Sequence, residues 1–399
     1  MLDLIIISNY WHFPNEKSNS RYAAVSELAV KAGFCTEVVT SRFYHTAKSH
    51  RNIGDISTPY KVTLLDEPPY KKNVSPQRVI AHRRFCKNVM AYLKRRKKPD
   101  VIYLFVPPTG LAKQVVKFAN KNGIRVVIDV LDLWPEAFGM FLPPVLAKPL
   151  LYPMKRSVEY AYRNADEIVA VSNSYALRAS SLNRKGAKGY GVFIGADKAV
   201  FDAAAKNAPP LTNRLRPITM VYIGMLGHSY DLCGVMDAMQ MLIKSGFDEV
   251  ELLVVGDGPL KPRFEAYAAQ KNLPVRFTGR LSYEDTVKTT VRCDIAVNVL
   301  VEKAAQSIIN KQSDYVFAAI PIINVQANGE FGDLLAEYNA GFGCKPGDTA
   351  ALAKIIRTLA QDETMRCTMG KNSRRLAEER FNRSSTYGTI IDAIKGDVK

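Results

Sequence analysis

Four short segments between residues 252 and 321 combine strand-like runs with residues that could bind a nucleotide. They read LLVVGDGP (252–259), VRFTGRLS (275–282), CDIAVNVL (293–300) and INKQSDYVFAAIP (309–321). Apolar β-branched runs that stop at Gly, Asp or Asn are typical of fully buried parallel strands. Residues just past such strands lie where open α/β sheets bind their ligands. The order of the segments therefore indicates a nucleotide site.

The last segment supplies two side chains of opposite charge. Lys311 and Asp314 are three residues apart, so a helix would present both on one face. A cation for phosphate and a carboxylate for ribose hydroxyls form a combination that suits a nucleoside diphosphate. The alternative is an ion pair on the helix surface.

Glycines follow two of the expected strands. Gly224 and Gly227 come after a strand in YIGMLGHS, and such a turn lets backbone N–H groups approach a pyrophosphate at the start of a helix. Gly256, Asp257 and Gly258 combine close approach with a carboxylate, which suits a planar base or a ribose. Plain tight turns are the alternative for both patterns.

The chain that must position these residues alternates strands with helices, as repeated βαβ units do. In the first half, strands are expected at 2–8, 36–40, 101–105, 125–130 and 167–172, and helices at 20–32, 111–122 and 150–163. In the second half, strands are expected at 219–223, 251–255, 275–278, 294–300 and 321–325, and helices at 260–271, 282–291 and 310–319. The predicted class is α/β, with two doubly wound parallel-sheet (Rossmann-like) domains facing each other across a cleft.

Length and composition agree with two globular domains in a reducing compartment. The chain has 399 residues, of which 47% are hydrophobic and 23% charged. Its six cysteines form no C-x-x-C pair, which argues against a zinc site or a disulfide framework. The first apolar run is too short for a signal peptide, and no apolar window has the length of a membrane span. A break near Gly195 and 205–217 places the boundary between domains 1–204 and 205–399, with the option that the last helix crosses back.

Positive charge is concentrated in the first domain. Residues 1–200 hold 31 Lys and Arg against 15 Asp and Glu, whereas the rest of the chain is nearly neutral. Residues 71–98 contain 11 basic residues and no acidic one. Their apolar residues are spaced as one stripe of a helix, which favours an amphipathic helix on an anionic membrane surface. A core-packed helix with a solvated face, and an acidic partner such as nucleic acid, are the alternatives. The membrane-facing candidates are Arg83, Arg84, Lys87, Lys94, Arg95 and Arg96.

Several segments together resemble one enzyme family. VYIGMLG, LLVVGDGP, VRFTGRLS, DYVFAAIP and NGEFGDLLAEYNAGFGCKPGD are similar to the nucleotide-sugar domain of retaining family 4 glycosyltransferases of the GT-B fold. DLWPE (132–136), ADEIVAVS (165–172) and IGADKAVF (194–201) resemble segments of its first domain. The resemblance is strongest to bacterial enzymes of lipopolysaccharide and capsule assembly. It implies a nucleotide-sugar donor, with a UDP-sugar as the preferred candidate, and transfer with retention of anomeric configuration. It also implies that the reaction needs no cofactor or divalent metal.

The resemblance also assigns donor-binding residues. The glutamates of the family's E-x7-E pair fall on Gln306 and Asp314, so that both positions depart from glutamate. Lys311 matches the lysine of a K-x-x-E-Y pattern and becomes the leading partner for the donor phosphates. Glu330 matches a glutamate before a helix start, and Arg280 in VRFTGRLS is counted with the donor site.

The acceptor is expected to bind the first domain. Asp132, Trp134 and Glu136 lie in the DLWPE loop, with His12 and Arg21 near the first strand. Arg21 matches an arginine that usually follows a glycine-rich turn, but the turn here is KSNS. Trp134 could stack on a sugar face or pack in the core, and His12 could bind sugar or be a buried polar residue.

The resulting hypothesis is transfer of a sugar to a glycan or polyprenyl-diphosphate-linked acceptor, with Asp132, Gln306 and Lys311 as the catalytic candidates. An enzyme acting on such a lipid would bind the inner face of the cell membrane from the cytoplasm, through the basic helix and the apolar stretch 141–153. A nucleic-acid partner is not expected. Two rivals remain: a nucleotide-sugar epimerase of the same fold, and a catalytically degenerate binding or scaffold subunit.

Overall fold

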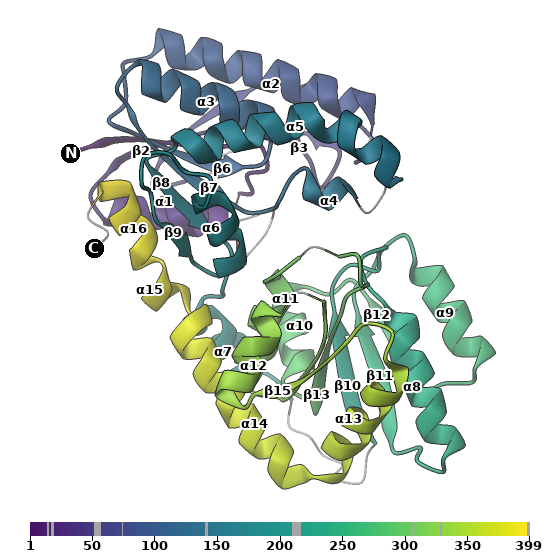
Figure 1. The fold of residues 1–399 in the computed structure, drawn as a ribbon. Coiled ribbons are helices and arrows are strands. Elements are labelled where there is room, and N and C mark those ends of the chain that lie inside the picture. The colour runs from purple at the N-terminus through teal and green to yellow at the C-terminus, as the bar shows by residue number, and fades with distance from the viewer. Residues whose placement is uncertain are drawn as a thin grey trace. The chain divides into compact units, whose positions relative to one another are not determined.

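The chain forms two compact units, each built on its own sheet. The computed structural model describes residues 1–13, 16, 20–51, 57–73, 75–139, 143–209, 217–304, 306–327 and 329–396. The first unit consists of Met1–Phe193 together with Tyr387–Lys399, and the second of Ile194–Thr386 (Figure 1).

Seven parallel strands form the sheet of the first unit, in the order β5-β2-β1-β6-β7-β8-β9. The three central strands β1, β6 and β7 are almost entirely buried, as continuous apolar runs predict. The strands are β1 (Asp3–Ser8), β2 (Cys35–Ser41), β5 (Lys61–Leu65), β6 (Val101–Val106), β7 (Arg125–Val130), β8 (Glu167–Ala170) and β9 (Gly189–Gly191), with a separate antiparallel pair β3 (Phe43–Tyr44) and β4 (Ser49–His50).

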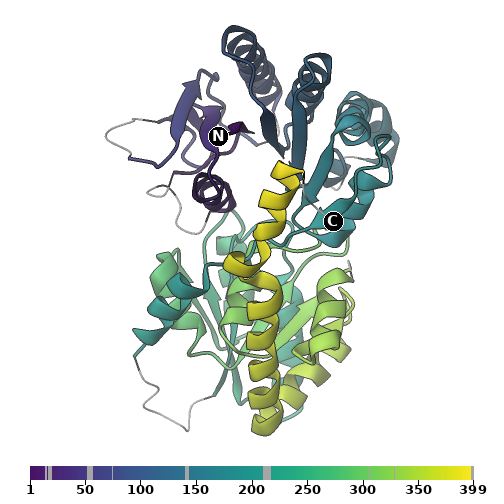
Figure 2. The same cartoon turned by 90° about the vertical axis from the view of Figure 1, so that its left-hand side faces the viewer.

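Helices connect these strands and cover the sheet. Helix α3 packs between α2 and α5, whereas α1 packs with the C-terminal helix α16 (Figures 1 and 2). The helices are α1 (Arg21–Lys31), α2 (Pro76–Arg95), α3 (Thr109–Lys121), α4 (Glu136–Gly139), α5 (Pro144–Asn164), α6 (Asn173–Ser180) and α16 (Gly388–Lys395). The α/β class and the alternation expected for this half of the chain are confirmed.

The second unit has six parallel strands in the order β12-β11-β10-β13-β14-β15. They are β10 (Ile218–Ile223), β11 (Val250–Val255), β12 (Val275–Gly279), β13 (Ile295–Val299), β14 (Ile322–Val325) and β15 (Gly341–Cys344). The expectation of fully buried strands is wrong for β12, which lies at the sheet edge and alternates half-buried with exposed residues. Strand β15 went unpredicted because two of its four residues are glycines, which are weak strand formers.

The helices of the second unit include one that the sequence assigned to the first domain. They are α7 (Lys198–Lys206), α8 (Leu232–Lys244), α9 (Lys261–Gln270), α10 (Tyr283–Thr290), α11 (Asn310–Phe317), α12 (Glu330–Tyr338), α13 (Thr349–Gln361) and α14 (Glu363–Leu376), followed by a π-helical turn (Ala377–Phe381) and α15 (Arg383–Thr386). Helix α7 packs on α10, and the rings of Phe201 and Phe317 lie 5.4 Å apart. The chain therefore enters the second unit after Phe193, ahead of the expected boundary at 204/205.

A buried ion pair joins distant parts of the first unit. Arg21 at the start of α1 is 4% exposed, and its Nε and Nη2 donate to the two carboxylate oxygens of Asp129 on β7, at 2.8 and 3.1 Å. Nη1 donates to the carbonyl oxygen of Val192 at 2.8 Å, and the guanidinium lies 5.1 Å from the ring of Tyr387. Burial works to lower the pKa of Arg21, but the charge and hydrogen bond of Asp129, together with Tyr387 and Tyr103, outweigh it and the pKa is raised.

Removal of one member of this pair should strongly destabilise the first unit. We expect Arg21→Met to lower its free energy of unfolding by about 3–5 kcal/mol, because Asp129 would keep a buried, unpaired charge. Urea unfolding followed by circular dichroism measures the change. In the control Arg163→Met, which breaks the partly exposed Arg163–Glu159 pair on α5, the loss should stay near 0.5 kcal/mol. Equal losses in the two variants would contradict the structural role of Arg21.

Candidate functional site

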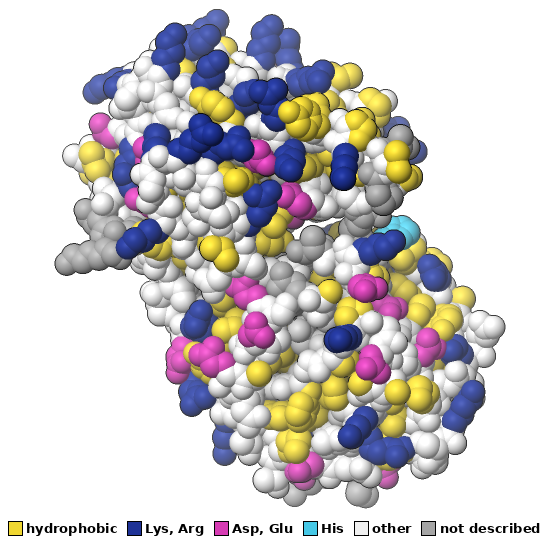
Figure 3. Space-filling view, in the orientation of Figure 1, with side chains coloured by type: hydrophobic (Ala, Val, Ile, Leu, Met, Phe, Trp, Pro, Cys, Tyr) yellow, Lys and Arg dark blue, Asp and Glu magenta, His cyan; other side chains and the backbone are white. Residues whose placement is uncertain are grey.

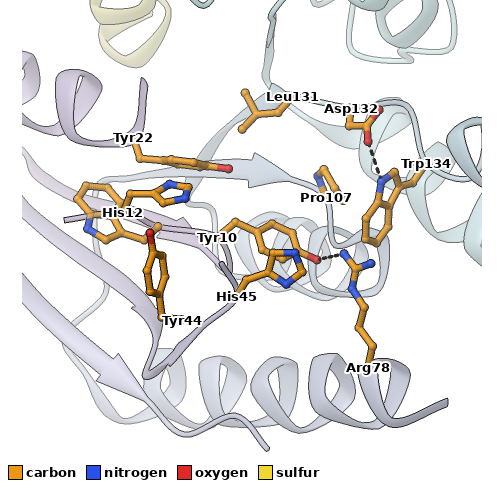
Figure 4. A pocket seen from close by; sticks show the side chains of 11 residues that line it. Tyr10, His12, Tyr22, Tyr44, His45, Arg78, Pro107, Leu131, Asp132 and Trp134 are labelled. Atoms are coloured by element: carbon orange, nitrogen blue, oxygen red, sulfur yellow. Dashed lines mark hydrogen bonds between the residues drawn. The ribbon is translucent and has the colours of Figure 1, made fainter. Parts of the chain in front are cut away.

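A pocket of about 210 Å³ opens in the first unit where β1, β6 and β7 end (Figure 4). Strands β1 and β6 are neighbours although β2 follows β1 in the chain, so this edge is a switch point of the sheet, where open α/β sheets bind ligands. Aromatic rings make up more than half of the pocket wall. The lining residues are Tyr10, Trp11, His12, Tyr22, Tyr44, His45, Arg78, Pro107, Leu131, Asp132 and Trp134.

One carboxylate and one guanidinium face this aromatic pocket. The indole nitrogen of Trp134 donates to Oδ2 of Asp132 at 3.0 Å, and burial raises the pKa of that carboxyl group. Arg78 reaches from α2 and donates from Nη2 to the hydroxyl of Tyr10 at 2.8 Å, while its guanidinium lies 4.9 Å from the ring of Trp134 (Figure 4). Aromatic rings that can stack on the faces of a sugar, next to polar groups that can bind its hydroxyls, suit a carbohydrate ligand.

The structure brings together three of the five residues expected at the acceptor. His12, Asp132 and Trp134 line the pocket. Arg21 does not, because its guanidinium is held inside the unit by Asp129, and Glu136 is exposed on α4 and pairs with Arg178 at 3.0 Å. These two assignments are corrected to structural and surface roles.

Sequence reasoning missed Tyr10, His45 and Arg78. Arg78 was hidden in the basic run 71–98, where it counted as one charge among many. Tyr10 and Arg78 are 68 residues apart, so their contact depends on the sheet order and not on a local pattern. The signal that could have found Tyr10 is its place just past β1, at the same sheet edge as Asp132.

Lys311 is the central residue of the second unit's site. It lies in the first turn of α11, is 6% exposed, and its Nζ has no hydrogen-bond partner among the residues that the structure describes. Nζ lies 3.8 Å and 3.9 Å from the ring centres of Tyr222 and Tyr230. Burial lowers the pKa of Lys311 well below 10.5. The chain thus keeps a cation-bearing side chain at the carboxyl ends of β10 and β13, which is this sheet's switch point.

Close backbone packing explains most of the glycines nearby. A Cβ on Gly256 would come within 1.9 Å of the carbonyl oxygen of Gly224, and one on Gly258 within 2.5 Å of that of Leu226. The N–H of Gly224 donates to Val255 at 2.9 Å, so it does not serve as a phosphate donor. A Cβ on Gly224 would lie 3.3 Å from Nζ of Lys311, so any side chain there would crowd the lysine. A Cβ on Gly227 would make only an ordinary contact, 3.7 Å from the side chain of Met225.

The remaining predicted donor residues lie at the same sheet edge. Asp314 accepts a hydrogen bond from the hydroxyl of Tyr283 on α10 at 3.1 Å, and Glu330 accepts one from Ser307 at 2.7 Å. The main-chain oxygen of Gln306 accepts a hydrogen bond from the side chain of Gln326 at 2.5 Å. Asp257 and Arg280 are both exposed, following β11 and β12.

Other parts of the described structure contain no equivalent site. A hollow of about 480 Å³ lies between β10–β12 and α10, and none of the predicted donor residues lines it. Among the described residues, His, Cys, Asp and Glu side chains form no group of three that could hold a metal ion.

Two parallel-sheet units, each with candidate binding residues at its switch point, are the architecture of the GT-B fold. Sucrose-phosphate synthase of Thermosynechococcus elongatus has the same fold, with a TM-score of 0.75 and 16% identity over 99% of both chains. HepE of Anabaena, solved in complex with UDP, gives a TM-score of 0.71 at 14% identity over 99% of this chain and 100% of that one.

Sequence comparison matches the second half of the chain to one family. Residues 205–376 match the family described as glycosyl transferases group 1, so the chain carries a group 1 glycosyltransferase domain. The probable glycosyltransferase WbjE of Pseudomonas aeruginosa is 24% identical over 344 residues, covering 79% of this chain and 83% of that protein. CapM of Staphylococcus aureus, a capsular polysaccharide biosynthesis glycosyltransferase, is 22% identical over 339 residues, covering 77% and 81%. The resemblance found in the sequence is confirmed.

Burial of Lys311 should make the stability of the second unit depend on pH. Between its lowered pKa and 10.5 the unfolded chain binds more protons at Lys311 than the native protein, so stability should rise with pH through this range. Lys311→Met lacks this contribution. We expect the variant to be more stable than wild type at neutral pH, with the difference shrinking toward pH 10.5.

Urea unfolding at a series of pH values, with binding partners left out, measures this difference. The exposed Lys303→Met is the matched control and should follow the wild-type pH profile. A Lys311→Met profile parallel to that of wild type would show that Lys311 is not desolvated in the native state.

Proposed function

We propose that this protein transfers a sugar from a nucleoside-diphosphate donor with retention of anomeric configuration. The preferred candidate for the donor is a UDP-sugar. The observation that carries the proposal is the buried side chain of Lys311 at the switch point of a group 1 glycosyltransferase domain. The use of UDP is supported by HepE, which binds UDP on the same fold. The proposal includes assembly of surface polysaccharide at the cytoplasmic face of the membrane, and the polysaccharide is supported by the relative CapM, a capsular polysaccharide biosynthesis glycosyltransferase.

The chemistry follows from the charge that the reaction creates. A departing nucleoside diphosphate gains negative charge, and a preplaced cation in a dry site stabilises that charge better than water does. Lys311 can supply the cation without a divalent metal, since an approaching phosphate restores its ordinary pKa. In this proposal Asp314 and Glu330 bind the ribose and the sugar of the donor, and Gln306 replaces a charged glutamate by a neutral hydrogen-bonding group.

The acceptor has its place in the pocket of the first unit. Trp134 and Tyr10 offer faces for a sugar ring. Asp132, whose pKa is raised by burial, is suited to accept the hydrogen bond of the attacking hydroxyl. The acceptor is a glycan or a polyprenyl-diphosphate-linked sugar, consistent with a carbohydrate-sized pocket.

Replacement of Lys311 should weaken nucleotide binding. We expect Lys311→Met to bind UDP at least about tenfold more weakly than wild type, because it loses a charge-assisted hydrogen bond. Isothermal titration calorimetry with UDP, GDP and ADP measures affinity and base preference. The control Lys303→Met removes the same charge from an exposed position and should bind UDP as wild type does.

Each rival function has its own outcome in the same series of experiments. UDP binding without turnover of any UDP-sugar would favour the binding or scaffold subunit. The presence of Gln306 and Asp314 at the positions of the family's two glutamates is the observation that supports this rival. An epimerised sugar without any acceptor would favour the epimerase. Wild-type protein that binds none of the three nucleotides would refute the proposed function.

The first unit also presents a basic and apolar surface suited to an anionic membrane. Lys and Arg side chains gather over α2, α3 and α5 (Figure 3). Val79 and Ile80 on α2, and Val145, Leu150 and Tyr152 on α5, are between 48% and 83% exposed. Both helices begin at the carboxyl edge of the sheet, beside the acceptor pocket. No described helix is long and apolar enough to cross a bilayer.

The helical stripe of the sequence prediction is divided in two by the structure. Phe85, Val89 and Leu93 are buried in the unit, whereas Val79 and Ile80 are exposed. Arg83, Arg84, Lys87, Lys94 and Arg95 are exposed, as a membrane-facing role requires. Arg96 is removed from this set, because it pairs with Asp3 at 2.9 Å and Glu37 at 3.4 Å.

Binding to anionic vesicles should depend on the exposed cations of α2. Each is worth roughly 1 kcal/mol near an anionic surface, so the triple variant Arg83→Ser, Arg84→Ser, Lys87→Ser should bind about a hundredfold more weakly. Vesicle sedimentation at low and high salt measures this loss. The control triple Lys244→Ser, Lys303→Ser, Lys354→Ser removes the same charge from the second unit and should bind as wild type. Equal losses in the two triples would contradict this surface assignment.

A further inference from the structure

Two cations meet around one tyrosine at the edge of the acceptor pocket. Nζ of Lys48 lies 5.0 Å from the ring centre of Tyr70, and the guanidinium of Arg78 lies 5.9 Å from the same ring. Lys48 follows β3 and Arg78 lies on α2, so separate elements bring like charges together. Burial and the charge of Arg78 lower the pKa of Lys48 to about 8. Such a pairing is unfavourable unless a negative charge joins it.

The groups that bind these cations are neutral. Lys48 donates to the side-chain oxygen of Asn73 at 2.6 Å and lies 3.1 Å from Nδ1 of His45. Arg78 donates to the hydroxyl of Tyr10 and to the main-chain oxygen of Asn73. Its Nε is buried and has no hydrogen-bond partner among the described residues. Part of the guanidinium fork is therefore available.

Two carboxylates act on Arg78 from a distance, but other donors hold them. Asp132 accepts from the indole nitrogen of Trp134 at 3.0 Å, and Glu67 accepts from the side-chain nitrogen of Asn9 at 2.8 Å. Burial raises the pKa of both carboxyl groups. Among the described residues, neither carboxylate forms an ion pair with Arg78 or Lys48.

The neighbouring histidines are kept neutral by this field. Burial, together with Arg78, lowers the pKa of His82 and of His45 to about 3, with Lys48 adding to the effect at His45. His82 lies 3.0 Å from the hydroxyl of Tyr10, and His45 lies 2.7 Å from that of Tyr70. Among the described residues, the cations at the ring of Tyr70 are therefore Arg78 and Lys48. Neutral imidazoles and hydroxyls around them can shape a site without adding charge.

We infer that the acceptor carries an oxyanion, a carboxylate or a phosphate, and that Arg78 binds it inside the aromatic pocket with Lys48 reinforcing the positive field. A guanidinium fork matches the two oxygens of either group. The stacking of Arg78 on Trp134 holds the fork in place. This inference rests on the proposed function and narrows its acceptor from any glycan to an anionic one. Arg78 is then the residue that distinguishes charged from neutral acceptors.

The two tryptophans of the chain, Trp11 and Trp134, both line this pocket, so their fluorescence reports on its occupancy. We would titrate the full chain with methyl glucuronide, with inorganic diphosphate, and with neutral methyl glucoside. At least one of the two anions should change the tryptophan emission at a concentration at least about tenfold lower than the concentration of methyl glucoside that gives the same change. Glucuronide acting alone would indicate a carboxylate, and diphosphate acting alone a phosphate. Equal responses to all three compounds would overturn the inference.

Variants assign the effect to Arg78. Arg78→Gln should weaken binding of the effective anion at least about tenfold more than it weakens binding of glucoside, with Arg78→Lys in between. Lys48→Gln should show a smaller loss, because Lys48 does not line the pocket. The control Arg84→Gln removes the same charge from an exposed position on α2 and should behave as wild type. Unchanged anion affinity in Arg78→Gln would overturn the inference.

Calorimetry with UDP on the same variants separates this inference from the proposed function. UDP binding should be unaffected in Arg78→Gln, and circular dichroism of the same variant checks that the first unit is folded. If wild type failed to bind UDP but its tryptophans still responded to anions, the donor assignment would fail while the anion site would stand. If UDP bound and the anions had no advantage over glucoside, only the anion site would be refuted.

Discussion

Parallel pairing of every strand in the two main sheets is the constraint on which the rest of the molecule depends. It sends all strand ends of a unit to one edge, and neighbouring strands then diverge into different loops. At that edge the first unit gathers aromatic rings with Arg78 and Asp132, and the second unit gathers Lys311 with its tyrosines. Residues far apart in sequence become neighbours there because sheet order, and not loop length, sets their distance.

Both edges hold basic side chains that form no ion pair among the described residues. Lys311 stands between two rings, and Arg78 and Lys48 share Tyr70. By contrast, the buried charge of Arg21 is fully matched by Asp129, and that pair supports the fold. A buried group with an ion-pair partner supports the fold, whereas one without a partner lowers stability until a ligand binds it. This distinction separates structural basic residues from those available to a ligand.

The sequence predicted the helices and strands better than it predicted the contacts between side chains. Continuous apolar runs placed β7 at its observed bounds, and Lys311 was found through its position past β13. Edge strands such as β5 and β12 were missed or misjudged, because one face of each meets solvent and the apolar signal is diluted. Arg21 and Glu136 matched a motif but serve other contacts, since a motif gives no side-chain direction. Arg78 needed the fold, because the run 71–98 carries no local sign that one of its charges turns inward.

The return of the chain at Tyr387 has a consequence for biosynthesis. Ile390, Ile391 and Ile394 belong to the core around β1, β6 and α1, and Tyr387 lies against Arg21. During translation the ribosome makes Ile194–Thr386 before these residues emerge. The first unit therefore cannot complete its core until the chain of the second unit has been synthesised, and it keeps an open apolar surface until then. A chaperone that covers that surface would find its substrate in this interval, although the waiting half was synthesised first.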